Sequence, residues 1–259
     1  MNEIHPSAVI HAQAELGANN HIGPHVVIEP DVVIGNGNQF LTGAVIKSGA
    51  HIGDNNVFHE HAVIAGLPQD LSFDAAEATR VSIGDNNTFR EAVTVNRAST
   101  KENRITQIGS DNYFMVGSHI AHDCQLGNEI VVAPYAGFAG HVHIADKAFI
   151  SGGVMVHQFV NIGRLAMVGG NAKITQDVLP FFITDGVPAY VKGINIVGLR
   201  RAGLLAADIK VLKQAYKILF TTASLERALR ELMNLDHDLA TQLHDFISAS
   251  KRSFHRTEK

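Results

Sequence analysis

The chain has 259 residues, enough for one large domain or two modest ones, and its 46% of hydrophobic residues predicts a substantial core. Its single cysteine excludes an internal disulfide and favours a reduced, cytoplasmic setting. The start of the chain lacks the features of a signal peptide, and no apolar run approaches the roughly 20 residues that cross a bilayer. We therefore expect a cytoplasmic protein with no membrane insertion and no nucleic-acid partner.

The net charge of −4 is unevenly distributed along the chain. Residues 1–199 carry 10 Lys and Arg against 18 Asp and Glu, a net charge of −8, whereas residues 200–259 carry 11 against 7, a net charge of +4. A basic C-terminal segment predicts an acidic partner, although ordinary solvated helix faces would give the same counts.

Large apolar residues recur at every sixth position of the first two thirds of the chain. One run covers positions 4 to 64 without a miss, a second covers 83 to 95, and a third covers 108 to 174. A helix needs apolar residues every three or four positions and an ordinary strand every two, so this period fits neither alone. It predicts short extended segments joined by turns, with three segments per 18-residue coil and parallel pairing between stacked coils.

Two further features complete the predicted coils. Glycine often follows the inward apolar residue, as at Gly35 and Gly84, where we expect a turn to use its conformational freedom. The register is interrupted by one residue within 65–82 and again within 96–107. Both segments are expected to be loops that project from the scaffold, where binding residues often lie.

From about residue 204 the apolar spacing becomes helical. The segments LLAADIKVLKQAYKILF, SLERALRELMNL with a Ser N-cap, and HDLATQLHDFIS each predict a helix, and residues 253–259 are expected to fray. The whole pattern resembles the hexapeptide-repeat acyltransferases. That resemblance implies a left-handed parallel β-helix in a first domain (residues 1–190) and an α-helical domain at residues 191–259.

The register assigns directions to the side chains of the motif GSHIAHDCQLGN. His119 lies one position before the inward Ile120 and His122 two positions after it, so neither fills the core. One coil after His122 comes Gly140, which we expect to stack on His122 and to bring its backbone N–H and the His141 imidazole close. With His157 these histidines would form a ridge along three coils, unless they are merely solvated corner residues.

Three chemistries could use this ridge. Zinc needs three or four converging histidines or thiolates, and γ-class carbonic anhydrases share such a site between subunits, but this chain offers no second cysteine. Nucleophilic catalysis by Cys124 is disfavoured because its register points inward. The third possibility is that His122 acts as a general base, with the Gly140 N–H stabilising an oxyanion. Asp123 either orients an imidazole or is only a turn residue.

A closer resemblance rests on several segments together. HIAHDC (residues 119–124), AGHVHI (139–144), VHQF (156–159) and GINIVGLRRAG (193–203) are similar to the UDP-N-acetylglucosamine O-acyltransferases that begin lipid A synthesis. PQDL and IGDNNTFREAVTVNR belong to the same resemblance, which covers nearly the whole chain. It implies a homotrimer with active sites between subunits and transfer of a 3-hydroxyacyl chain from acyl carrier protein to the sugar 3-hydroxyl.

The resemblance also implies roles for individual residues. His122 would be the general base and Gly140 the oxyanion donor. The sugar contacts would be Asp70, His119, His141 and Gln158, and the residues near the nucleotide or phosphopantetheine would be His157, Asn195 and Arg201. The acidic carrier protein would meet the basic C-terminal segment, and no metal or bound cofactor is expected. Glycine at position 170 implies a chain of about 12 to 14 carbons, since a pocket discriminates acyl length by the methylenes that it admits.

Four positions depart from the family pattern. Ser72 replaces a lysine, Asn96 a histidine, Val187 an asparagine and Val197 a glutamate. Because losing a hydrogen-bonding partner alters discrimination strongly, acyl transfer is predicted while the acceptor stays open. The alternatives are a 3-amino sugar or another nucleotide sugar as acceptor, a zinc-dependent hydratase, and a binding scaffold without catalysis.

Overall fold

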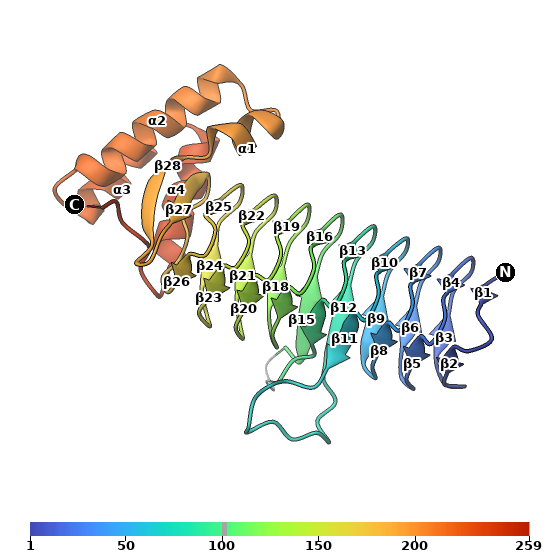
Figure 1. Cartoon of the computed structure of the whole chain (residues 1–259). Helices are drawn as coiled ribbons and strands as arrows, with labels where there is room; N and C mark the ends of the chain where they lie inside the picture. The colour runs from blue at the N-terminus through green and yellow to red at the C-terminus, as the bar shows by residue number, and fades with distance from the viewer. Residues whose placement is uncertain (100–102, 259) are drawn as a thin grey trace.

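The computed structural model describes residues 1–99 and 103–258, and it shows a prism of stacked coils with helices at its C-terminal end (Figure 1). The N-terminus lies at one end of the prism, and the four described helices gather at the other. The described strands, each two to five residues long, form the three sheets that make the faces of the prism.

The sheets contain the following described strands. The first sheet holds β1 (Glu3–Ile4), β4 (His21–Ile22), β7 (Gln39–Phe40), β10 (Val57–Phe58), β13 (Thr88–Phe89), β16 (Tyr113–Phe114), β19 (Val131–Val132), β22 (Phe149–Ile150), β25 (Met167–Val168), β27 (Phe182–Asp185) and β28 (Tyr190–Ile194). The second sheet holds β2 (Val9–Ile10), β5 (Val27–Ile28), β8 (Val45–Ile46), β11 (Val63–Gly66), β14 (Thr94–Asn96), β17 (His119–Ile120), β20 (Gly137–Phe138), β23 (Met155–Val156) and β26 (Lys173–Ile174). The third sheet holds β3 (Glu15–Leu16), β6 (Val33–Ile34), β9 (Ala50–Ile52), β12 (Arg80–Ile83), β15 (Ile105–Ile108), β18 (Gln125–Leu126), β21 (His143–Ile144) and β24 (Asn161–Ile162).

Pairing between coils follows the predicted register. Ile4 pairs with Ile22 and Ile22 with Phe40, in parallel and 18 residues apart. Every predicted inward position from Ile22 to Ile174 is buried. Ile4, in contrast, is 47% exposed, because no described coil covers that end of the prism.

Two internal ladders stabilise the coils, and the six-residue period does not reveal them. Phenylalanine rings stack at centroid distances of 4.8 to 4.9 Å, through positions 40, 58, 89 and 114. Buried asparagines form a second column, through positions 20, 38, 56, 87 and 112, in which each side-chain carbonyl accepts the backbone N–H of the next. These bonds satisfy polar groups that would otherwise be buried without partners.

The glycines that follow inward residues serve a different purpose from the one expected. The backbone of Gly35 and Gly84 is not in the left-handed region. A Cβ at Gly35 would lie 2.7 Å from the carbonyl oxygen of Gly53, and one at Gly84 would lie 2.8 Å from that of Gly109. Glycine is therefore needed at these positions because the backbone of the next coil leaves no room for a Cβ. The conformational explanation was wrong.

The chain leaves the prism at two places. The connection from β11 to β12 is the large loop that projects from the middle of the prism, in teal in Figure 1. The connection from β14 to β15 leaves at the next coil, and residues 100–102 within it lie outside the described part of the chain. These connections fall within the two segments where the period slips.

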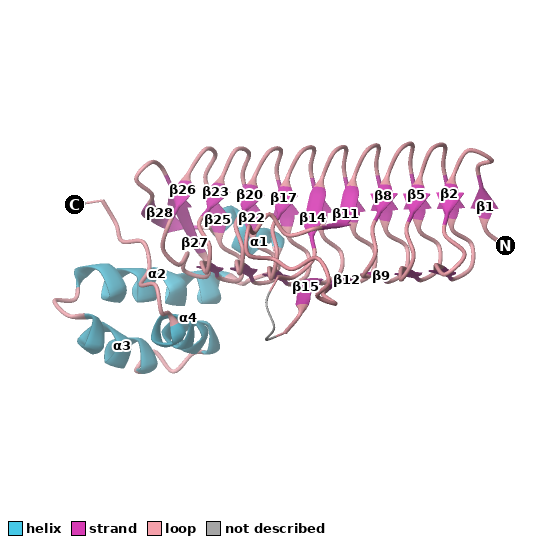
Figure 2. Cartoon of the chain, turned by 90° about the horizontal axis from the view of Figure 1, so that it is seen from below, coloured by secondary structure: helices cyan, strands magenta, loops and turns pink. Residues whose placement is uncertain are grey.

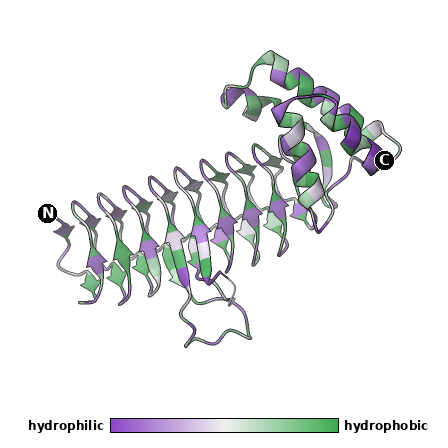
Figure 3. Cartoon of the chain, turned by 180° about the vertical axis from the view of Figure 1, so that it is seen from behind, coloured by the Kyte–Doolittle hydropathy of each residue, from purple (hydrophilic) through white to green (hydrophobic). Residues whose placement is uncertain are grey.

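The C-terminal helices are α1 (Ile196–Arg201), α2 (Ala206–Thr221), α3 (Leu225–Met233) and α4 (Asp238–Ala249), and Figure 2 shows the last three grouped together from below. The three predicted helices correspond to α2, α3 and α4, and Ser224 caps α3 by accepting from the N–H of Arg227. Figure 3 shows hydrophilic and hydrophobic residues alternating along these helices, as expected for amphipathic helices that pack around a second core. The boundary predicted between residues 190 and 191 falls inside β28.

The segment after α4 is ordered against the prism, so the fraying predicted from residue 253 was wrong for the described residues up to 258. Phe254 bridges to Asp177 as an isolated parallel pair, and both are buried. The His255 ring hydrogen-bonds the Ala189 carbonyl at 2.9 Å. No helix among the described residues is both long and apolar enough to cross a membrane.

Candidate active site

The predicted stacking of two turns is present. His122 and Asp123 occupy the turn between β17 and β18, and Gly140 and His141 occupy the turn between β20 and β21, one coil later. The His141 N–H donates to the His122 carbonyl at 3.1 Å, which fixes one turn on the other.

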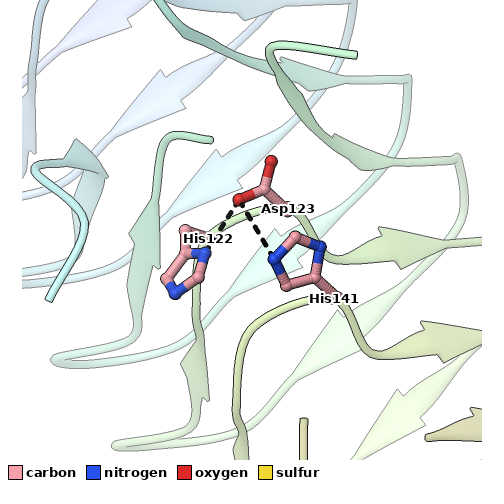
Figure 4. Close-up of side chains that lie close together, drawn as sticks. All are labelled: His122, Asp123 and His141. Atoms are coloured by element: carbon pink, nitrogen blue, oxygen red, sulfur yellow. Dashed lines mark hydrogen bonds and ion pairs between the residues drawn. The ribbon is translucent and has the colours of Figure 1, made fainter. Parts of the chain in front are cut away.

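Two imidazoles converge on the Asp123 carboxylate (Figure 4). Its Oδ2 lies 2.8 Å from Nδ1 of His122 and 3.8 Å from Nε2 of His141. The two rings stand nearly perpendicular, at 89° with 5.4 Å between centroids. Since the carboxylate is 6% exposed and accepts from Nδ1–H, it fixes the His122 tautomer that leaves Nε2 able to accept a proton.

Residues that the sequence did not reveal support this carboxylate. Oδ2 of Asp123 accepts from the Ser99 N–H at 2.9 Å and from the Ser99 Oγ at 3.0 Å. The same Oγ lies 3.0 Å from Nδ1 of His122, and the Asp123 N–H donates to Oγ1 of Thr106 at 2.8 Å. Ser99 lies in the segment where the period is interrupted, so no register predicted its direction.

Asp123 is both the turn residue and the hydrogen-bonding residue that the sequence left as alternatives. Its φ of 60° puts it in the left-handed region, where Asp and Asn are among the side chains most often tolerated. His141, at the equivalent position one coil later, has a φ of 61°. The turn conformation is therefore what aims both side chains at one point.

Gly140 has no room for a side chain, because an added Cβ would lie 2.4 Å from Cε1 and 2.7 Å from Nε2 of His122. Among the described residues, its backbone N–H has no acceptor. The equivalent first turn position holds proline at Pro6, Pro24 and Pro134, which shows that the coil does not need this N–H. The Gly140 N–H is thus available to a ligand beside His122.

His119 and Asp70 lie within electrostatic reach of His122. His119 points outward from β17, and its Nδ1 lies 2.7 Å from Oγ1 of Thr94. Burial, with a smaller contribution from the charge of His122, lowers the pKa of His119. Hydrogen bonds from the N–H and Oγ of Ser72 lower the pKa of Asp70, to which His122 also contributes.

Cys124 is buried in the main core, as its register predicted. Burial raises the pKa of its thiol to about 12, and its Sγ–H donates to the Ala139 carbonyl at 3.3 Å. A thiol in that state is a core side chain and not an activated nucleophile.

His122, Asp123 and His141 are also close enough together to hold a metal ion, since their ligand atoms lie within 4.8 Å of one another. The 2.8 Å separation between Nδ1 and Oδ2 is that of a hydrogen bond, and Oδ2 also accepts twice from Ser99. This donor set fits a shared proton better than a shared cation.

Comparison with known proteins decides the family. A family model described as UDP-N-acetylglucosamine O-acyltransferase, domain 2, matches residues 177–255, and one described as bacterial transferase hexapeptide (six repeats) matches residues 31–66. A curated acyl-[acyl-carrier-protein]–UDP-N-acetylglucosamine O-acyltransferase of Gloeothece citriformis is 46% identical over 191 residues, which cover 73% of this chain and 68% of that protein. The chain belongs to the UDP-N-acetylglucosamine O-acyltransferase family.

Solved structures of the same family agree along nearly the entire chain. The UDP-N-acetylglucosamine acyltransferase of Francisella novicida is 33% identical, with a TM-score of 0.96 and coverage of 99% of this chain and 95% of that one. The Bacteroides fragilis enzyme is 36% identical, with a TM-score of 0.93 over 98% and 100%. The predicted left-handed parallel β-helix with C-terminal helices is thereby confirmed.

The other substrate-binding residues that the family resemblance implies do not all lie near His122 within one chain. His157 and Gln158 lie in the turn one coil beyond Gly140, where Phe159 stacks on His141 at 4.5 Å. Gly170 lies at a different corner of the prism, after β25, and a Cβ there would meet nothing nearer than 3.6 Å.

Asn195 and Arg201 line a separate groove of about 320 Å³ beside α1. Asn195 is used structurally, because its Oδ1 accepts from the Gly198 N–H at the start of α1 and its Nδ2 donates to the Leu165 carbonyl. Arg201 is exposed at the end of α1.

The four departures from the UDP-N-acetylglucosamine O-acyltransferase pattern lie in three environments. Val187 and Val197 are exposed, at 69% and 61%. Ser72 donates to Asp70. Asn96 is buried, and its Nδ2 donates to the Leu67 carbonyl at 3.0 Å while its Oδ1 has no hydrogen-bond partner.

Proposed function

We propose that the protein transfers a 3-hydroxyacyl chain from acyl carrier protein to the 3-hydroxyl of UDP-N-acetylglucosamine, the first step of lipid A synthesis. The observation that carries the proposal is the pairing of a histidine held by a buried carboxylate with a spare backbone N–H on the next coil, His122 with Asp123 facing Gly140. The family to which the chain belongs supports the choice of donor and acceptor.

The reaction begins with proton removal from the acceptor. Nε2 of His122 takes the proton of the sugar 3-hydroxyl as its oxygen attacks the thioester carbonyl. Asp123, bonded to Nδ1, stabilises the imidazolium that forms. This use of His122 needs the acceptor hydroxyl on the exposed side of the ring, away from Asp123.

The tetrahedral intermediate then collapses. The Gly140 N–H donates to the negatively charged oxygen, the carbon–sulfur bond breaks, and the imidazolium returns its proton to the leaving thiolate. The products are the sugar ester and the carrier's free thiol, so His122 ends in its starting state. No step needs a metal or a bound cofactor, and a chelator is expected to leave the rate unchanged.

The sugar contacts proposed are Asp70, His119, His141 and Gln158. His119 and Asp70 are within electrostatic reach of His122. His141 lies beside the same Asp123 carboxylate that His122 contacts. The lowered pKa of His119 favours a neutral ring at this position, which can both donate to and accept from sugar hydroxyls.

A homotrimer with active sites between subunits accounts for the residues that lie apart in one chain. Gly170, Asn195 and Arg201 lie away from the His122 corner, and a neighbouring subunit could bring such groups to it. The acidic carrier protein would dock near the basic residues 200–259, with the thioester reaching the cleft from there. A reduced cytoplasmic setting is proposed with it, since the carrier protein supplies the donor there.

The second candidate is the same transfer to a 3-amino sugar nucleotide, which forms an amide. The departures from the family pattern support it, because a changed set of polar side chains can alter which acceptor is discriminated, and Asn96, whose buried Oδ1 has no hydrogen-bond partner, stands where that pattern has a histidine. Asn96 donates to the Leu67 carbonyl at the start of the loop that carries Asp70, one of the proposed sugar contacts.

One assay tests both candidates. Purified protein is given a panel of acyl carrier protein thioesters with UDP-N-acetylglucosamine and its 3-amino analogue in competition, and the products are identified by mass. His122→Ala is expected to lose about 100-fold or more in rate while it remains folded. Acylation of neither sugar, or an unchanged rate in that variant, would refute the proposed function.

A further inference from the structure

A groove of about 580 Å³ connects the active-site corner with the C-terminal tail. Asp123, His141 and Phe159 line one part of it, and Lys251 and Arg252 line another. The tail residues come from the segment directly after α4, so the helical region contributes directly to the surroundings of the catalytic turn.

Arg252 is held in this groove without a matching anion. Its Nη2 lies 3.4 Å from Nδ1 of His157 and 3.4 Å from the Thr175 carbonyl, and its Nε is buried without a hydrogen-bond partner. Within residues 1–99 and 103–258, no carboxylate lies at ion-pairing distance from Arg252 or its neighbour Lys251. Two adjacent cations with no protein carboxylate beside them fit an anionic ligand.

The tail around Arg252 is anchored, which keeps the guanidinium in place. Ser250 Oγ donates to the buried Asp177 carboxylate at 2.7 Å, and the Asp177 N–H donates to the Ser253 carbonyl at 3.0 Å. Phe254 is buried two residues after Arg252. A fixed cation loses little conformational entropy when a ligand binds, and this smaller cost favours binding of an anion at Arg252.

We propose that Arg252, with Lys251 next to it in the chain, binds a phosphate group of a substrate. This inference rests on the proposed function. The spacing suits a phosphate attached to the acceptor. Arg252 contacts His157, whose neighbour Gln158 occupies the same turn position as His122 but two coils later. Because paired strands lie about 4.8 Å apart, two coils place Arg252 roughly 10 Å from His122. One sugar ring and its diphosphate can span that length. The phosphopantetheine phosphate of the carrier is the other source of the same chemistry.

The experiment compares three variants of the full chain. Arg252→Met removes the charge and keeps the length, and Arg252→Lys restores a charge without the planar fork. Ser250→Ala is the matched control, because it removes one anchor of the tail and leaves both cations. For each protein, thermal unfolding is recorded, UDP binding is measured by calorimetry, and KM is determined separately for the nucleotide sugar and for the acyl carrier protein.

The proposal expects Arg252→Met to weaken UDP binding and raise the KM of the sugar by about 10- to 100-fold, with a much smaller change in kcat, because a charge-assisted hydrogen bond is lost. Arg252→Lys should recover part of the loss, and Ser250→Ala, which loosens one anchor but keeps both cations, should lose much less affinity than Arg252→Met. If only the KM of the acyl carrier protein rises, the site stands and its phosphate belongs to phosphopantetheine.

Two results would overturn the site. One is unchanged affinity for both substrates in Arg252→Met. The other is an equal loss in Arg252→Met and Ser250→Ala with a matching fall in thermal stability, which would make Arg252 a tail anchor. The proposed function can fail separately, since UDP binding is measured without acyl transfer. A wild-type protein that binds UDP through Arg252 but acylates no sugar would refute that function alone.

Discussion

Gly140 and His122 share one corner of the prism so closely that a Cβ on the first would lie 2.4 Å from Cε1 of the second. The glycine carbonyl accepts from the N–H of Phe159 in the following coil, which fixes its backbone on the side away from His122. The ring would therefore have to move to admit a methyl group. The absence of a side chain allows the base and the backbone N–H to face the same point.

Gly140→Ala is accordingly expected to fold and to lose activity. The alanine displaces the His122 ring from the position where it meets the oxyanion donor, so kcat should fall about 100-fold or more. Steady-state kinetics and thermal unfolding measure the two effects separately. A variant with normal kcat would show that the close contact of Gly140 with the His122 ring does not matter to the reaction.

Asp123→Asn tests the carboxylate that receives Nδ1 of His122. The amide preserves the shape but removes the charge that stabilises the imidazolium, and it can hold the ring in the wrong tautomer. We expect kcat to fall about 100-fold or more, with little change in the KM of either substrate. A large rise in KM with unchanged kcat would instead assign Asp123 to substrate binding.

Ser99 is predicted to position this carboxylate through its hydroxyl. Ser99→Ala removes one hydrogen bond to an ionised oxygen, while the backbone N–H bond remains, so we expect about a 10-fold loss in kcat and a shift in the pH–rate profile. Ser99→Thr keeps the hydroxyl and should restore most of both. If alanine and threonine have equal effects, the hydroxyl has no positioning role.

The sequence predicted the prism because each inward position needs an apolar residue, and these positions recur along the chain with a fixed period. The same period placed His122 opposite Gly140 and turned Cys124 inward, and both predictions are confirmed. Register could not place Ser99, because the loop that carries it is outside the period. Nor could it show that residues 253–258 dock, since burial of Phe254 depends on packing against a distant turn.

Acid should destabilise the fold through histidines whose pKa is lowered in the folded state. Burial is the largest cause of the lowered pKa at the half-buried His119 and the buried His255. Between those lowered values and about 6.5, the unfolded chain binds more protons than the folded one, so stability rises with pH. The free energy of unfolding should therefore fall as the pH decreases from about 7 to about 5.

The contribution of one of these rings can be isolated. His255→Gln removes a ring that must stay neutral, so its stability should vary less steeply with pH than that of the wild type. Denaturant titrations across the pH range measure this slope. His11→Gln, at an exposed position, is the control and should keep the wild-type slope. A steeper slope in His255→Gln would contradict the sign of the argument.

The asparagine column should dominate the stability of the central coils. Asn56 is fully buried, its Oδ1 accepts from the N–H and Nδ2 of Asn87, and its Nδ2 donates to the Gly84 carbonyl. Asn56→Ala leaves these groups buried without partners, at a cost of about 1 to 3 kcal/mol each, so we expect at least 3 kcal/mol in all. Asn36→Ala, at an exposed position with one similar bond to the Ala18 N–H, should cost below about 1 kcal/mol. Chemical denaturation of both variants measures the difference. Equal losses would mean that burial of the column adds nothing to its hydrogen bonds.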